Sequence, residues 1–95
     1  MTYYKRRVDA NQNQIIHTFI ALGASVLNLS RVGEGAPDLA IGYKGKTVFV
    51  EVKRDEKAKY TEPQIKFMQN WRGGPVSRID SVDAAIRLIK MLDMA

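Results

Sequence analysis

Apolar positions along this 95-residue chain follow two periods, one typical of helices and one typical of strands. Between residues 10 and 22 they are spaced by one, three and four, which indicates one face of a helix that Gly23 is placed to end. These residues are Ile15, Ile16, Phe19, Ile20 and Leu22. Residues 24–30 follow as a strand, and the runs 38–43 and 46–53 are rich in strand-forming residues. The first half therefore predicts a helix followed by three strands.

The second half predicts a helix, a strand and a helix. Thr61 is a predicted N-cap, and Gln64 is placed to complete a capping box. The apolar side of that helix comprises Ile65, Phe67, Met68 and Trp71. Trp71 is expected in the core, and the alternative is an exposed indole near Arg72 that stacks on an unpaired base. A Gly-Gly-Pro break at residues 73–75 precedes a short strand at residues 76–79.

Asp80 or Ser81 is expected to cap a last helix through Met91. Its predicted buried stripe consists of Val82, Ala85, Ile86, Ile89 and Leu92. The order α-β-β-β-α-β-α predicts an α/β fold in which helices flank a small mixed sheet. A chain of 95 residues is expected to form one domain, residues 1–95.

The two central strands are separated only by Lys44 and Gly45, a signal for a two-residue hairpin turn. That turn fixes the register, so Asp38 is expected directly opposite Glu51, with side chains roughly 5 Å apart. Lys53 lies two residues beyond Glu51 and therefore on the same face of the strand. Two carboxylates and one lysine should share a small volume.

Like charges that oppose each other in a hairpin are destabilising, so a positive group is expected between them. A hard divalent cation, Mg²⁺ or Mn²⁺, suits two carboxylates, a backbone carbonyl and waters. The lysine ammonium would then offset charge on a phosphate or help to deprotonate water. The alternative is a surface hairpin in which Lys53 pairs with Glu51 and Asp38 caps a turn after Pro37.

Fifteen basic and ten acidic residues give a charge of +5, which suggests an anionic partner. The basic residues cluster at Lys5, Arg6 and Arg7 and again at Lys53, Arg54, Lys57 and Lys59. Such clusters bind phosphates without reading sequence, although each lysine is also explained as a solvated surface residue. The chain has no cysteine and one histidine, which excludes a disulfide framework and a multi-histidine zinc site. It has no apolar run near the roughly 20 residues that span a membrane, and we expect a soluble protein.

The residues around the hairpin resemble a known family. Gly35-x-Pro37-Asp38-Leu39 and Val50-Glu51-Val52-Lys53 are similar to the PD-(D/E)xK nuclease superfamily, most closely to its VRR-NUC branch in the compact form encoded by phages. The likeness extends to Asn11-Gln12, Gly23-Ala24-Ser25-Val26, Thr61-x-x-Gln64 and Trp71-Arg72-Gly73. It implies a restriction-endonuclease-like core and a metal-dependent nuclease related to Holliday-junction resolvases. It also implies the cytoplasm of a phage-infected or prophage-carrying bacterial host.

The resemblance assigns roles. Asp38 and Glu51 are expected to bind the metal with the Val52 carbonyl as a third ligand, and Lys53 is expected to be the catalytic cation. Gln12 stands where resolvase-like members have an acidic residue, so it is either a packing residue or holds a water or phosphate. Gln64 either caps its helix or lies near the catalytic residues.

Two functions are consistent with these residues. The first is a nuclease that cuts DNA, and the second is a non-catalytic nucleic-acid-binding module with an incidental acidic pair. The short chain and the resembling resolvases lead us to expect a homodimer that acts on branched DNA, a Holliday junction or a flap.

Overall fold

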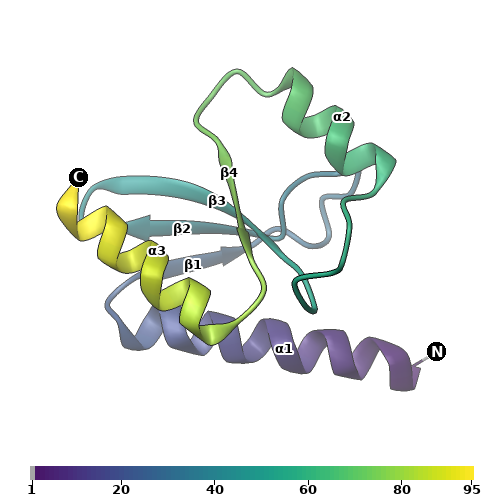
Figure 1. Cartoon of the computed structure of the whole chain (residues 1–95), viewed down its shortest axis with the longest axis horizontal. Coiled ribbons are helices and arrows are strands. Elements are labelled where there is room, and N and C mark those ends of the chain that lie inside the picture. Colours follow the sequence, from purple (N-terminus) through teal and green to yellow (C-terminus); the bar gives the residue numbers. More distant parts are fainter. Residues whose placement is uncertain (1) are drawn as a thin grey trace.

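The computed structural model describes residues 2–95, with side chains described from residue 11 onward (Figure 1). Its elements follow the predicted order, and their bounds are α1 (Thr2–Ala21), β1 (Ser25–Asn28), β2 (Leu39–Tyr43), β3 (Lys46–Val52), α2 (Glu62–Asn70), β4 (Val76–Ile79) and α3 (Val82–Met94). The predicted α/β architecture is therefore confirmed. In this described part of the chain, no helix is long and apolar enough to cross a membrane.

The four strands form one mixed sheet in the order β1-β2-β3-β4. Neighbours are antiparallel except for β3 and β4, which are parallel and joined through α2. The predicted hairpin register is confirmed, with Tyr43 opposite Lys46 and Leu39 opposite Val50. Lys44 and Gly45 have φ angles of 48° and 80°, as a two-residue turn that matches the strand twist requires.

One face of the sheet forms the core against α1 and α3, which Figure 1 shows packed beside each other. Leu39, Ile41 and Val50 are fully buried on this face, because alternate strand residues point to the same side. They meet a layer of helical side chains that includes Ile15, Phe19, Ala85 and Ile89. The opposite face carries Phe49 and Glu51, and α2 lies on that side.

Helix α1 begins at Thr2, eight residues before the predicted start. The apolar pattern could not reveal this first part, because residues 2–9 have no periodic apolar stripe. Gly23 follows the helix with a φ of 96°, which confirms it as the terminating residue. Ile20 was expected on the buried face but is 54% exposed, whereas Ile15 and Phe19 are fully buried. At about 100° per residue, Ile20 is turned well away from both of them around the helix.

Helix α3 is capped by Ser81, whose hydroxyl accepts a hydrogen bond from the Ala84 amide. Its buried residues are Ala84, Ala85, Leu88 and Ile89. The buried face of α3 is therefore turned around the helix axis relative to the predicted stripe, and Val82 is exposed.

Helix α2 has both halves of the predicted capping box, between Thr61 and Gln64. None of its residues is buried, however. Trp71 is 42% exposed, so the expected core position is wrong and the alternative of an exposed indole is the one observed.

Candidate active site

Asp38 and Glu51 come together at the end of the hairpin. Glu51 is 4% exposed, and Asp38 is half-buried just before β2. The Asp38 carboxylate reaches across to β3, where its Oδ2 accepts a hydrogen bond from the Val52 amide at 2.8 Å. Asp38 is thus fixed against the strand that carries Glu51, which differs from the alternative of a turn cap after Pro37.

The pKa of the Glu51 carboxyl is raised from its ordinary 4.5 to about 8, and burial is the largest cause. The charge of Asp38 and a hydrogen bond with it contribute to the same rise, while the charge of Lys53 opposes it. Without a cation between the two carboxyls, Glu51 therefore holds a proton at neutral pH. A positive charge beside Asp38 and Glu51 would favour the ionised form of both carboxyls, and Lys53 provides only part of that charge.

The Gln64 side chain connects Glu51 with Lys53. Its Nε2 donates to Glu51 Oε2 at 2.7 Å, and its Oε1 accepts from Lys53 Nζ at 2.8 Å. The same Oε1 accepts from the Thr61 amide at 2.8 Å. The capping interpretation and the site interpretation of Gln64 are therefore compatible, because one side chain makes both sets of contacts. Lys53 approaches Glu51 through this amide, in contrast to the expected alternative of a direct ion pair.

The backbone of Lys53 is held on both sides. Its amide donates to the Ile79 carbonyl at 3.0 Å, and its carbonyl accepts from Asn11 Nδ2 at 3.1 Å. Its ammonium lies 5.2 Å from the centroid of the Tyr60 ring. Sequence reasoning missed Asn11, although its position beside Gln12 in the family pattern was a signal that could have found it.

Gln12 is half-buried and faces a different region from Asn11. It lines a polar hollow of about 310 Å³ together with Asn13, Asn28, Ser30 and Arg31. The hydrogen bonds of the described side chains include none from Gln12 to Asp38 or Glu51. The structure thus brings Gln64 to the carboxylates and leaves Gln12 beside β1.

The basic residues Arg54, Lys57 and Lys59 are exposed on the loop after β3, residues 53–61. Arg78 holds this loop from β4, because its guanidinium donates to the carbonyls of Asp55 and Ala58, each at 2.8 Å. Arg78 is paired with Glu51 in the β3–β4 ladder, so the anchored loop starts beside the carboxylates. The predicted contacts of Lys5, Arg6 and Arg7 lie outside the described side chains.

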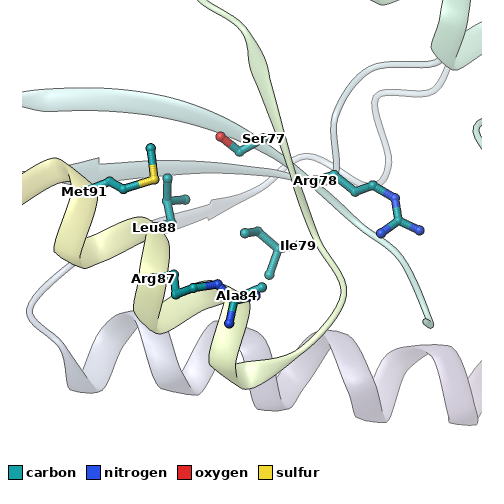
Figure 2. A pocket seen from close by; sticks show the side chains of 7 residues that line it. All are labelled: Ser77, Arg78, Ile79, Ala84, Arg87, Leu88 and Met91. Atoms are coloured by element: carbon teal, nitrogen blue, oxygen red, sulfur yellow. The ribbon is translucent and has the colours of Figure 1, made fainter. Parts of the chain in front are cut away.

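Another hollow, of about 280 Å³, lies between β4 and α3 (Figure 2). Its lining comes from residues 77–91 of the described chain and includes Ile79, Leu88 and Met91 but no carboxylate. Figure 2 shows the Arg78 guanidinium extending away from these apolar side chains. This hollow therefore lacks the acidic groups that a metal-assisted reaction needs.

The donor set at Asp38 and Glu51 fits a hard divalent cation. Carboxylate oxygens are the ligands that Mg²⁺ and Mn²⁺ prefer, and Mg²⁺ sites often use one or two carboxylates with several waters. The described residues contain no group of three or more His, Asp or Glu side chains that could hold a metal. A cation here would depend on the two carboxylates, a backbone carbonyl and water.

The mixed sheet, with a hairpin that presents Asp38, Glu51 and Lys53 together, defines a domain of the PD-(D/E)xK class. A solved structure described as a VRR_NUC domain is 34% identical to the chain, with a TM-score of 0.73. The match covers 88% of this chain and 95% of that one. The chain therefore belongs to the VRR_NUC family, which confirms the resemblance and places it among nuclease domains. No family model and no curated protein matches the chain.

Proposed function

We propose that the protein is a DNA nuclease that hydrolyses phosphodiester bonds with Mg²⁺ or Mn²⁺. The observation that carries this proposal is the burial of Glu51 beside Asp38, with a pKa raised to about 8. Two ionised carboxylates at such a place repel each other, and a bound cation would offset that repulsion. Membership of a nuclease family supports the same conclusion.

Asp38 and Glu51 would hold the cation, with the Val52 carbonyl as a third ligand. When bound, the cation supplies Lewis-acid stabilisation of phosphate charge and lowers the pKa of water. Lys53 provides a second positive charge for the reacting phosphate, and Gln64 keeps its ammonium in place through a 2.8 Å hydrogen bond. Asn11 and Ile79 restrain the backbone that carries this lysine.

The DNA backbone would follow the basic loop beyond β3. Arg54, Lys57 and Lys59 are exposed there, and phosphate contacts of this kind give affinity without sequence selection. Lys5, Arg6 and Arg7 are proposed as further contacts to DNA phosphates. Because Arg78 already anchors the loop, fewer degrees of freedom would be lost when DNA binds.

A cleavage panel tests the proposal. The purified protein should cut DNA with Mg²⁺ or Mn²⁺ and should lose this activity in excess EDTA. Equal cleavage under chelation would contradict the metal mechanism. Binding to the same DNA without turnover under any of these cations would instead favour a non-catalytic binding module.

The proposed substrate is branched DNA, and the proposed assembly is a homodimer in the bacterial cytoplasm. Small domains bury a limited core, and two-fold dimers are the commonest oligomers, which supports pairing of two chains. Two paired sites would cut opposing strands of a four-way junction. The expected solution mass is twice that of one chain, with symmetric nicks that exceed those on linear duplex. A monomer that cuts junctions, flaps and duplex equally would contradict this part alone.

A further inference from the structure

An aromatic cluster lies next to the carboxylates on the same face of the sheet. The Trp71 ring stacks on Phe67, with centroids 5.2 Å apart and planes 15° from parallel. Phe49 meets Trp71 edge-on, with centroids 5.1 Å apart and an interplanar angle of 67°. Trp71 remains 42% exposed. Its indole is thus held by two aromatic neighbours while a large part of it faces solvent.

Two glycines keep the surroundings of the indole open. A Cβ at Gly73 would lie 2.6 Å from the indole Nε1, so any side chain there would collide with the ring. A Cβ at Gly74 would meet no atom within 4 Å. Hollows of about 250 and 260 Å³ adjoin this segment, and Trp71, Gly73, Gly74 and Pro75 line both of them. The exposed indole therefore borders space that side chains leave unfilled.

The cluster is connected to the carboxylates through β3 and through α2. Phe49 precedes Glu51 by two residues on the same face of β3, a rise of about 7 Å. Helix α2 carries Gln64, which contacts Glu51, and Phe67, which supports Trp71. Arg72, the residue that follows Trp71 in the sequence, is exposed. The aromatic stacking surface is thus joined to the carboxylates of the proposed active site both along β3 and through α2.

We propose that this aromatic site, formed by Trp71, Phe49 and Gly73-Gly74, binds an unpaired nucleobase of the strand that is cut. The inference rests on the proposed function and adds a substrate class: DNA that is single-stranded or locally unpaired beside the scissile phosphate. Bases stack on exposed aromatic side chains whatever their identity, because every base has a π-face. A paired base is already stacked inside its duplex and must leave it before it can reach the protein.

Trp71 is the only tryptophan of the chain, so its fluorescence reports on this site directly. An oligo-dT strand titrated into the wild-type protein in EDTA should quench the emission. A strand of equal length made of abasic nucleotides keeps the phosphates and should quench far less. Equal quenching by both strands would overturn the proposal. Because this titration requires no hydrolysis, its failure is distinguishable from failure of the nuclease proposal, which metal-dependent cleavage tests.

Variants provide a second test. Trp71→Ala should weaken binding of the oligo-dT strand by about 5- to 150-fold, measured by fluorescence anisotropy with a labelled strand. Trp71→Phe should restore most of the affinity, and binding of blunt duplex should be unchanged in both variants. Met91→Ala, at a residue of α3 that is 65% exposed and lines the other hollow, is the control and should bind like the wild type. Equal weakening for single strand and duplex would contradict base stacking. If Trp71→Ala is unfolded at the assay temperature, the test of base stacking is the comparison of oligo-dT with the abasic strand on the wild-type protein.

Discussion

Gly35 is in backbone contact with Pro63. A Cβ added to Gly35 would lie 2.1 Å from the Pro63 carbonyl oxygen and 2.8 Å from the Gln64 amide nitrogen. The loop that delivers Asp38 therefore lies directly against the first turn of α2, which delivers Gln64. Only glycine permits this approach, because any other side chain would meet the backbone of the helix.

Gly35→Ala should therefore separate Gln64 from Glu51 and lower the cleavage rate by about 100-fold, since displacements near 1 Å have effects of that size. The matched control is Gly33→Ala in the same loop. Gly33 and Gly35 have φ angles of 79° and 78°, but a Cβ at Gly33 would meet nothing within 4 Å. Both variants bear the cost of an alanine at positive φ, roughly 1 to 2 kcal/mol. Equal cleavage rates in the two variants would show that the contact with α2 is unimportant.

Metal binding should distinguish the role of Asp38 from the role of Lys53. Asp38→Asn keeps an oxygen for the Val52 amide but removes the charge, so we expect Mn²⁺ binding and cleavage to be lost while the fold remains. Lys53→Ala should keep Mn²⁺ binding and lower mainly the chemical rate. Calorimetric Mn²⁺ titrations and single-turnover cleavage measure the two effects. The assignment fails if Lys53→Ala loses Mn²⁺ as completely as Asp38→Asn, or if either variant cuts like the wild type.

The two sets of contacts made by Gln64 can be tested apart. Thr61→Ala removes the hydroxyl of the N-cap and should lower stability by about 1 kcal/mol, while leaving the bonds of Gln64 to Glu51 and Lys53 intact. Gln64→Ala removes those bonds as well, and we expect cleavage to fall by about 10- to 100-fold. Rates are compared at a temperature where circular dichroism shows both variants folded. Indistinguishable rates would mean that Gln64 serves only as a cap.

The metal-free protein should become less stable as the pH rises. The folded state holds the Glu51 proton up to about pH 8, whereas the unfolded state releases it near 4.5. Between these values the folded state binds more protons, so the free energy of unfolding should fall by up to about 1.4 kcal/mol per pH unit. Urea unfolding in EDTA measures this slope, and Glu51→Gln should flatten it. Mn²⁺ should restore stability at pH 8. An equal slope in Glu51→Gln would contradict the raised pKa.

Local signals in the sequence were enough for the hairpin, its register and the capping box. Lys44-Gly45 fixes a turn, a turn fixes which residues face each other, and Thr61 with Gln64 marks a helix start. Period and register are therefore sufficient to predict Asp38, Glu51 and Lys53 in one small region.

Contacts between segments that are distant in the sequence could not be predicted from such local signals. Asn11 reaches the Lys53 carbonyl across 42 positions of sequence, and only the packing of α1 against the sheet decides that Asn11, and not Gln12, points there. Trp71 has the hydrophobicity of a core residue, but it caps α2, a helix without buried residues, and is 42% exposed. No sequence pattern distinguishes Arg78 from other surface arginines. Its hydrogen bonds to the carbonyls of Asp55 and Ala58 follow only from its position on β4.

Helix α2 has no buried residue, yet it carries the amide that joins Glu51 to Lys53. Elements with so few buried contacts open locally at much lower free energy than the core does. Each opening removes Gln64 from the site while the sheet remains folded. The apparent affinity for a ligand that needs the closed helix is then reduced by the closed fraction. Stabilising α2, or binding DNA against it, would raise the proportion of competent molecules without altering any group that touches the phosphate.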